Sequence, residues 1–309
     1  MLEIIVPYFL GIDGGGTKTT CTVGDETRVL ATATAGPSNI VRIGESQTRE
    51  SLQMSVRQAC AAAGISPEQV TRTCVGGSGA ARPELAEIVR GILAEIISTP
   101  IDVVGDMQIA LEAAFDAGPG VIVIAGTGSI AYGRDRHGKT IRAGGWGFAI
   151  GDEGSAHWIG RAAVSAVLRT SDLQGEAGIS ASPSLAEDLC RKWGVTSLLD
   201  LARAANSIPP PDFASLFPAV AASNDELARQ VLRQAGRELA QVAGIVIRRL
   251  FAEETVVPVA MTGGVFGHSE LVRQVFYNEL RKLESRAQVN PKVVDPVEGA
   301  LRTARRAAS

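Results

Sequence analysis

The feature that most constrains this chain is a strand closed by glycines and followed by a hairpin, because the pattern occurs twice. In the first copy, the apolar residues 8–12 run into a glycine cluster, and residues 19–23 and 28–34 follow as alternating, β-branched segments. In the second copy, the apolar residues 121–125 precede a hairpin around His137 and Gly138. Alternation and β-branching predict strands, and the repetition predicts two related halves.

The segments that follow each hairpin predict an α/β fold, since helical periodicity alternates with short apolar runs. A boundary near Gly118 gives an N-terminal lobe of residues 1–117 and a C-terminal lobe of residues 118–309, whose last helix could pack back on the first lobe. Further strands are expected at residues 71–75, 101–104, 256–261 and 288–294, and helices at 44–63, 83–97, 107–115, 153–168, 184–193, 197–205, 225–251, 269–283 and 297–306.

Composition narrows the function classes. The formal net charge is −3, without a basic footprint, which disfavours nucleic acid as a partner. No stretch approaches the roughly 20 apolar residues of a membrane helix, and the N-terminus lacks the basic start of a signal peptide. The four cysteines form no CxxC pair and are expected to be reduced thiols of a cytoplasmic protein. The paired arginines 248–249 and 305–306 are expected on solvated helix faces.

The first candidate site is the segment Gly11-Ile12-Asp13-Gly14-Gly15-Gly16-Thr17-Lys18. Consecutive glycines let backbone amides converge on an anion, and Thr17 and Lys18 add a hydroxyl and a cation. Asp13 is a candidate for holding Mg²⁺ through water. A P-loop or a Rossmann loop would open into a helix, whereas the residues after Lys18 favour a strand. Phosphate binding is therefore expected, and a plain hairpin turn is the alternative.

Three weaker signals also lie where strands end. Residues 126–129, with Thr127 and Gly128, repeat a glycine-closed turn that could bind phosphates from the second half. Asp106 follows a strand, where a carboxylate can serve as a base in phosphoryl transfer or merely cap the next helix. Gly263 and Gly264 close a late strand, where the backbone can lie against an adenine or ribose, although a tight turn explains them equally well.

A further signal is the loop of residues 144–156, which has five glycines around one tryptophan and contains two acids, followed by an expected helix. Sugars are bound by aromatic faces, backbone groups and carboxylates. Asp152 could accept hydroxyl hydrogens or cap a helix that starts at residue 153. Trp146 could contact a sugar, although tryptophan more often packs in the core.

Taken together, these motifs resemble the BadF/BadG-type ATPase family, and within it the N-acetylglucosamine and glucosamine kinase branch of the actin/hexokinase/Hsp70 superfamily. The motifs occur in the family's order along nearly the whole chain: the triple glycine, GPSN at 36–39, GGSG at 76–79, GD at 105–106, GTGS at 126–129, GGWG to GDEGSA at 144–156, and TGGV at 262–265.

The resemblance implies a duplicated ribonuclease H-like fold of two lobes with a nucleotide cleft between them, Mg·ATP as co-substrate and a homodimer. It implies that Asp106 is the base that activates the 6-hydroxyl of an amino sugar. The sugar site that it implies consists of Asn39, Ser78, Asp106, Gly145, Trp146, Gly147, Asp152 and Ala156. The ATP site that it implies, extended by the neighbouring turn residues, consists of Gly14, Gly15, Gly16, Thr17, Lys18, Thr127, Gly128, Gly263 and Gly264.

The sequence departs from the family pattern at Gly105, where asparagine is usual, and at the bulky Met107. The choice among N-acetylglucosamine, glucosamine and N-acetylmuramic acid therefore stays open. One rival function is an ATPase that activates a CoA-ester reductase or dehydratase, which would need cysteine ligands for an iron–sulfur cluster. Another is a non-catalytic sugar or nucleotide sensor on the same fold.

Overall fold

The computed structural model describes residues 6–80, 82–174 and 185–307, which divide into two compact units. The first unit contains residues 1–118 and 294–309, and the second contains residues 119–293. The C-terminal segment is thus part of the first unit, although it follows the second along the chain. Residues 1–5, used above to argue against a signal peptide, and Ser184, the expected start of a helix, lie outside the described residues.

The first unit is built on a five-stranded sheet in the order β3-β2-β1-β4-β5. β1, β2 and β3 form an antiparallel meander, and β4 and β5 extend it in parallel with β1. Its elements are β1 (Tyr8–Gly14), β2 (Thr19–Gly24), β3 (Val29–Ala35), α1 (Ile40–Ala62), β4 (Val70–Gly77), α2 (Pro83–Ala94), β5 (Ile101–Gly105), α3 (Asp106–Phe115) and α11 (Pro296–Arg306).

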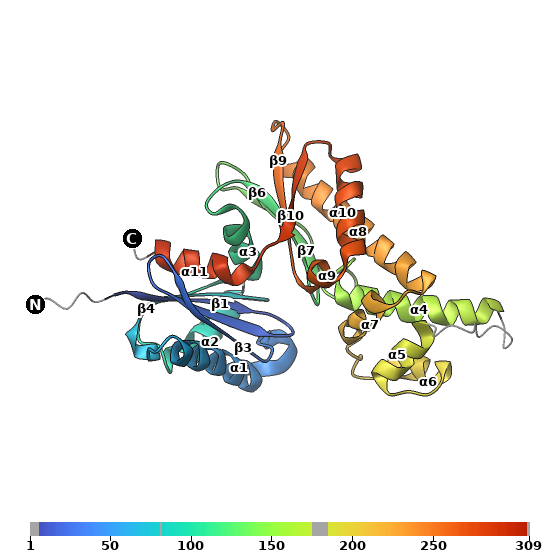
Figure 1. The fold of residues 1–309 in the computed structure, drawn as a ribbon, viewed down its shortest axis with the longest axis horizontal. Helices are drawn as coiled ribbons and strands as arrows, with labels where there is room; N and C mark the ends of the chain where they lie inside the picture. The colour runs from blue at the N-terminus through green and yellow to red at the C-terminus, as the bar shows by residue number, and fades with distance from the viewer. Residues whose placement is uncertain (1–5, 81, 175–184, 308–309) are drawn as a thin grey trace, which may run out of the picture. The chain divides into compact units, whose positions relative to one another are not determined.

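Helices cover both faces of this sheet (Figure 1). Leu10 and Ile12 of β1 are fully buried in a core shared with α1 and α2, whereas the preceding Phe9 packs with α3 and α11 on the other face. This alternation is the period-two pattern of a strand that is buried on both sides.

The second unit repeats the strand order, as β8-β7-β6-β9-β10. β6, β7 and β8 form the meander, and β9 and β10 run parallel to β6. Its elements are β6 (Gly120–Ala125), β7 (Ser129–Arg134), β8 (Thr140–Gly144), α4 (Ala156–Gln174), α5 (Leu185–Trp193), α6 (Leu198–Ala205), α7 (Phe217–Ala222), α8 (Glu226–Leu250), β9 (Val257–Thr262), α9 (Gly264–His268), α10 (Glu270–Leu283) and β10 (Ala287–Val293).

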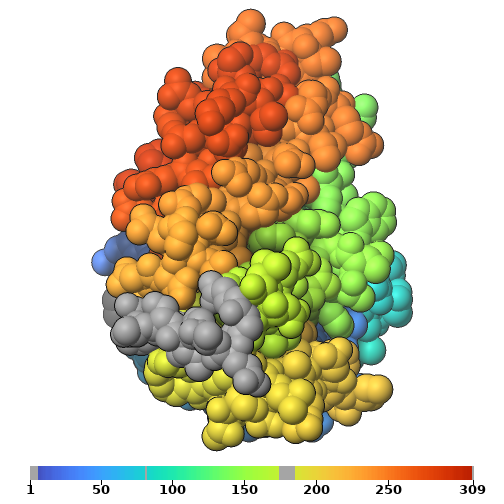
Figure 2. All heavy atoms as spheres, turned by 90° about the vertical axis from the view of Figure 1, so that its right-hand side faces the viewer, coloured from blue at the N-terminus to red at the C-terminus, as the bar shows by residue number. Residues whose placement is uncertain are grey.

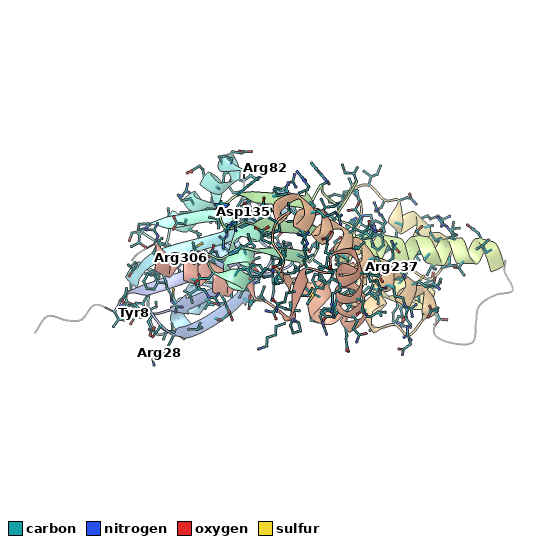
Figure 3. All side chains as sticks on the ribbon, turned by 90° about the horizontal axis from the view of Figure 1, so that it is seen from above. Tyr8, Arg28, Arg82, Asp135, Arg237 and Arg306 are labelled. Carbon is teal, nitrogen blue, oxygen red and sulfur yellow. The ribbon has the colours of Figure 1, made fainter. Side chains whose placement is uncertain are left out.

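The repeated topology confirms the predicted duplication and the α/β fold. α8 lies on the meander of the second unit, and its outward face carries charged residues such as Arg237 (Figure 3). α4 packs on α8, and the short helices α5 and α6 extend beside it, where they form one end of the face in Figure 2.

Three predicted details differ in the structure. The helix expected from residue 153 begins at Ala156, because residues 152 and 154 have positive φ values of 60° and 80°. The helix expected from residue 44 is preceded by a short helical segment from Ile40, from which it is separated by Gly44, whose φ of 78° and ψ of 173° are not helical. The short helices α7 and α9 were missed, because five or six residues are too few to show helical periodicity.

The C-terminal helix α11 lies directly on α3. A Cβ added at Gly299 would come within 1.9 Å of the carbonyl oxygen of Ile109, so only glycine allows this approach. Arg302 donates to the carbonyls of Glu112 and Ala113, and Arg306, labelled in Figure 3, pairs with Glu112 at 2.7 Å. The end of α11 is therefore anchored by charged side chains as well as by apolar packing.

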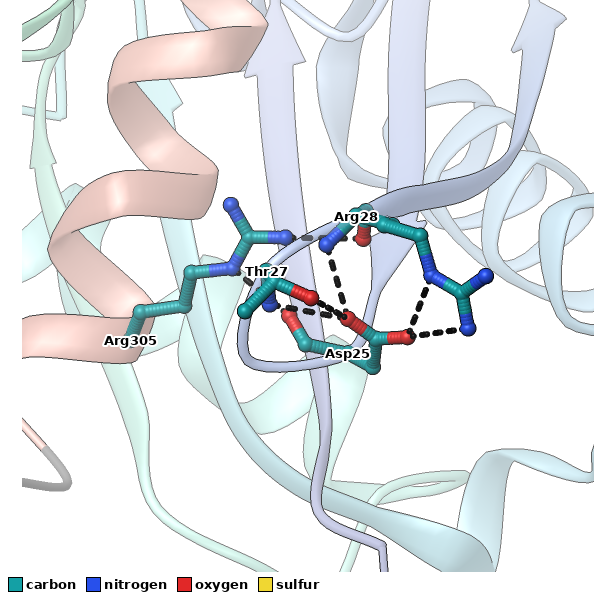
Figure 4. Close-up of polar contacts among 4 residues, drawn as sticks. All are labelled: Asp25, Thr27, Arg28 and Arg305. Carbon is teal, nitrogen blue, oxygen red and sulfur yellow. Dashed lines mark hydrogen bonds and ion pairs between the residues drawn. The ribbon is translucent and has the colours of Figure 1, made fainter.

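Arg305 also departs from the solvated face that was expected for it. Its Nε donates to the carbonyl of Asp25 at 2.7 Å, and its Nη2 donates to the carbonyl of Arg28 at 2.8 Å (Figure 4). The Asp25 carboxylate in turn accepts bonds from the amides of Thr27 and Arg28 at 2.8 and 2.7 Å. The β2–β3 turn is thus closed by Asp25 and tied to α11 by Arg305.

These amide bonds, first that of Arg28 and then that of Thr27, hold the pKa of Asp25 at about 2, below its ordinary 3.8. A lowered folded-state pKa means that the stabilisation is complete above about pH 4 and is lost as the pH falls towards 2. We therefore expect Asp25→Asn to lower the urea midpoint of unfolding clearly near pH 7 and much less near pH 2. Glu26→Gln, which removes the neighbouring exposed charge, is the control. An equal loss for Asp25→Asn at both pH values would contradict this account.

Candidate functional site

In the first unit, four predicted motifs meet at one edge of the sheet. β1, β4 and β5 are parallel, so their carboxyl ends lie together, as ligand-binding edges of α/β sheets do. Gly14 follows from β1, Ser78 from β4 and Asp106 from β5, while Ser38 and Asn39 precede α1. Motifs up to 92 residues apart in sequence therefore form one group, called here the first-unit group.

Backbone hydrogen bonds hold this group together. Gly15 donates to the carbonyl of Lys18 at 3.0 Å, which closes a tight turn that leads into β2 and not into a helix. Ser38 donates its amide to the carbonyl of Gly15 at 3.1 Å, and Ser78 donates its amide to the carbonyl of Gly14 at 3.2 Å. The expected strand after Lys18 is confirmed, so the turn is neither a P-loop nor a Rossmann loop.

The carboxylate of Asp106 is held on both oxygens. Ser78 Oγ donates to Oδ2 at 2.7 Å, and the amide of Met107 donates to Oδ1 at 2.8 Å. Gly105 occupies the N-cap position, so Asp106 is the first helical residue and not the cap that was the alternative. An oriented carboxylate at the end of a parallel strand is geometrically suited to accept a proton from a bound alcohol.

Asp13 lies in a field of negative charge. Burial, followed by the charges of Asp106 and Asp295, raises the pKa of Asp13 from 3.8 to about 7, and Lys18 opposes the shift. The sequence analysis missed Asp295, which caps α11 through a bond from the amide of Val297 to Oδ1. An Asp-Pro pair ahead of a helix is a recognisable capping signal. It does not predict that Asp295 lies near Asp13, which is 282 positions earlier in the chain.

The negative charges around Asp13 favour binding of a divalent cation that retains several water ligands. Among the described residues, no three His, Cys, Asp or Glu side chains are grouped as a metal cage. Mg²⁺ is commonly bound through one or two carboxylates and several waters, together with substrate phosphates. Asp13 fits that role, and a bound cation would favour its ionised form.

Asn39 carries an unused acceptor. Its Oδ1 atom is buried and has no hydrogen-bond partner, and although Asn39 stands at the N-cap position of α1, its side chain does not cap the helix. Buried polar atoms are nearly always bonded, so an unbonded one at a candidate site indicates a place for a ligand donor.

In the second unit, the turn after β6 bonds to the start of α4. Gly126 donates to the carbonyl of Gly128 at 2.9 Å, and the amide of Ala156 donates to the carbonyl of Gly126 at 2.8 Å. His157 donates its amide to the carbonyl of Thr127 at 3.3 Å. Two of the amides that a helix start leaves free are thereby used to fix the turn.

Asp152 joins this turn to the glycine-rich loop. Its Oδ1 accepts from the amide of Gly147 at 3.2 Å, and its Oδ2 would lie 2.7 Å from a Cβ added at Gly128. Burial raises the pKa of Asp152, against the lowering effect of the Gly147 bond. Because α4 begins at Ala156, Asp152 is a link between two loops and not the helix cap considered above.

The loop itself presents apolar side chains to solvent. Trp146 is 67% exposed and Ile150 is 81% exposed, so the general expectation of a core tryptophan does not hold here. Gly145 and Gly147 have φ values of 68° and 96°, which shape the loop. Phe148 packs on His157 with ring centroids 5.0 Å apart, which fixes the middle of the loop to α4.

The end of β9 completes the second-unit group. Gly263 has φ 102°, and a Cβ there would lie 2.4 Å from the carbonyl oxygen of Ala125, so this turn sits directly on the turn after β6. Gly264 is exposed at the start of α9. A polar hollow of about 490 Å³, lined by residues that include Asn224, Arg229, His268 and Gln274, lies at the other end of α9.

The second-unit group therefore unites Thr127, Gly128, Gly145, Trp146, Gly147, Asp152, Ala156, Gly263 and Gly264. The hollow was not predicted. Its residues come from α7, α8, α9 and α10 and from the short segments between neighbouring helices, and they share no sequence motif.

None of the helices in the described part of the chain is long and apolar enough to cross a membrane.

The comparisons with known proteins agree with this fold and these motifs. The model of the BadF/BadG/BcrA/BcrD ATPase family matches residues 10–304, and the chain belongs to this family. The resemblance inferred from the motifs is thereby confirmed.

Relatives and solved structures extend the comparison. An N-acetylmuramic acid/N-acetylglucosamine kinase of Clostridium acetobutylicum is 33% identical over 282 residues, which cover 89% of each chain. A solved structure from Chromobacterium violaceum, provisionally named an N-acetylglucosamine kinase, has a TM-score of 0.75 at 27% identity and covers 96% of this chain and 98% of its own. A ROK family glucokinase of Streptomyces griseus, solved with glucose and AMPPNP, has a TM-score of 0.65 at 16% identity over 97% and 99% of the two chains. It shares the two-lobed actin-like ATPase fold.

The Asp152–Gly128 contact can be tested by its steric demand. Gly128→Ala would place a methyl group against Oδ2 of Asp152 and displace it from the amide of Gly147, and overpacking of this kind costs about 1–3 kcal/mol. We expect a lower free energy of unfolding, measured by urea titration. Gly126→Ala is the matched control in the same turn, since a Cβ there meets no atom within 4 Å. Equal stability of the two variants would show that the Asp152 contact is loose.

Proposed function

We propose that this protein is an ATP-dependent kinase that transfers a phosphoryl group to the 6-hydroxyl of an amino sugar, with N-acetylglucosamine as the first candidate. The observation that carries the proposal is the Asp106 carboxylate, which is oriented by Ser78 at the strand edge that also holds the glycine turn and Asp13. The relatives named as N-acetylglucosamine kinases support the choice of sugar.

The nucleotide is assigned to the glycine turns. Gly14, Gly15, Gly16, Thr17 and Lys18 would contact phosphates in the first unit, as would Thr127 and Gly128 in the second. Mg²⁺ held by Asp13 through water would neutralise phosphate charge when bound. Gly263 and Gly264 would lie against the nucleoside, whose base would reach the polar hollow beside α9.

The sugar is assigned to the residues that the family resemblance implies. In the first unit these are Asp106, the orphan Oδ1 of Asn39, and Ser78. In the second unit they are the loop Gly145, Trp146 and Gly147, the carboxylate of Asp152, and Ala156 at the start of α4. Carboxylates and amide oxygens accept the hydrogens of sugar hydroxyls.

In the proposed reaction, Asp106 accepts the proton of the 6-hydroxyl as its oxygen attacks the γ-phosphorus, and the bond to the β-phosphate oxygen breaks to release ADP. Ser78 and the Met107 amide hold the carboxylate in the orientation needed for proton transfer. Positioning and charge neutralisation supply most of the rate in reactions of this class.

The cysteines favour a kinase over a redox activator. Cys21, Cys60 and Cys74 are buried, and burial raises the pKa of Cys60 to about 11 and that of Cys74 to about 12. Thiols in this state pack as core side chains and are poor cluster ligands, which must be thiolates. Reduced thiols also suit the cytoplasmic location that we propose, and the homodimer implied by the family resemblance can be tested by light scattering.

Replacement of the proposed base gives the direct test. Asp106→Asn should lower kcat by about 10²–10⁴-fold, the usual contribution of general-base catalysis, while sugar affinity stays within about tenfold. ADP release across a panel of hexoses and hexosamines gives kcat, and calorimetric titration gives affinity. Ser78→Ala, which removes only the orienting bond, should cause a smaller loss. Near-normal turnover by the Asn variant would sink the assignment, and sugar binding without ADP release by the unaltered protein would indicate a sensor.

A further inference from the structure

Thr19 and Ser38 are buried hydroxyl residues beside the first-unit group, and the proposed reaction gives neither of them a role. Thr19 is the first residue of β2, directly after the glycine turn, and Ser38 directly precedes Asn39. Thr19 is fully buried and Ser38 is 7% exposed. One hydroxyl therefore adjoins the turn that we assign to phosphates, and the other adjoins a residue that we assign to the sugar.

The hydroxyl of Thr19 is shared between two acceptors in the segment that leads to Asn39. It donates to the carbonyl of Gly36 at 2.7 Å and to Oγ of Ser38 at 2.7 Å. Pro37 lies between these two acceptors, and its ring fixes φ and leaves no amide hydrogen to donate. The two bonds of Thr19 thus hold the segment on both sides of a rigid residue.

Ser38 joins the same segment to the glycine turn. Its amide donates to the carbonyl of Gly15 at 3.1 Å. A Cβ added at Gly14 would lie 2.8 Å from Oγ of Ser38, so the serine hydroxyl packs directly against the turn. A change in the turn that moves the carbonyl of Gly15 therefore also acts on the residue before Asn39.

The long helix α1 does not by itself position Asn39. Gly44 has φ 78° and ψ 173°, which separates residues 40–43 from the rest of α1. The side chain of Asn39 does not cap the helix, and its Oδ1 is buried without a hydrogen bond. The fixed points next to Asn39 on its N-terminal side are the bonds of Ser38 and Thr19.

We propose that Thr19 and Ser38 are positioning residues that couple the two substrates. Phosphates that order the glycine turn also fix Asn39, so the acceptor sugar binds more tightly once the nucleotide is bound. The inference rests on the proposed function and adds two residues to the same site, neither of which has to contact a substrate. Such coupling requires only that one ligand orders what the other binds, and it acts equally in both directions.

The test measures acceptor affinity by calorimetric titration, with and without magnesium AMPPNP, which is not turned over. The acceptor is the hexosamine with the highest kcat/KM in the ADP-release panel, in the first instance N-acetylglucosamine. For the unaltered protein we expect the nucleotide to raise sugar affinity by about tenfold, within the usual range of coupling between sites. The sugar should raise AMPPNP affinity by the same factor, because coupling is reciprocal.

Thr19→Val keeps the shape of the side chain, removes both bonds and should lower this coupling factor to about two or less. Thr19→Ser keeps the hydroxyl and should restore the factor. Ser38→Ala keeps the Thr19–Gly36 bond and the amide bond to Gly15 and should give an intermediate factor. The double variant with Thr19→Val should be no worse than Thr19→Val alone, since that change already removes the bond between the two side chains.

Thr22→Val is the matched control. It removes another buried hydroxyl of β2, which bonds to Oγ1 of Thr32 at 2.9 Å, and should leave the coupling factor unchanged. A merely structural role of Thr19 would lower the binding stoichiometry and kcat without changing the factor, and that result would overturn the inference. An equal fall in both valine variants would overturn it too.

The same measurements separate this inference from the proposed function. A coupling factor near one in the unaltered protein, together with normal ADP release, would overturn the inference and leave the kinase assignment standing. Absence of both sugar binding and ADP release with every hexosamine would overturn both.

Discussion

Backbone hydrogen bonds that join the turns at strand ends to neighbouring segments are the interaction on which both candidate groups depend. In the first unit, the carbonyls of Gly14 and Gly15 accept the amides of Ser78 and Ser38. In the second unit, the carbonyl of Gly126 accepts the amide of Ala156. Each bond fixes a turn that bears candidate ligands without using a side chain.

The edges of the two sheets carry different chemistry on the same topology. The first-unit group concentrates acids, and burial together with neighbouring charges brings the pKa of Asp13 to about 7. The second-unit group has the exposed Trp146 and the buried Asp152. The function proposed above would place the base on the first copy of the duplicated fold and sugar-binding residues on both copies.

Because the C-terminal helix packs on the first unit, that unit consists of two separate stretches of the sequence. α11 lies on α3 and β1, and its arginines bond to carbonyls at the end of α3 and in the β2–β3 turn. A helix so anchored stabilises the sheet whose edge carries Asp13 and Asp106. It also brings Asp295 into the charge field of Asp13, which links the end of the chain to its first strand.

The sequence by itself determined the repeated pattern of a strand and a hairpin, the glycine-closed turns and the family, because strand alternation and glycine clusters are local patterns that neighbouring residues fix. It also supplied the residue types of both candidate groups. Only the tertiary structure decided that Ser78 orients Asp106, that Asp152 links two loops instead of capping a helix, and that Trp146 is exposed. These features depend on contacts between segments that are distant along the chain or on burial, and local periodicity carries no information about either.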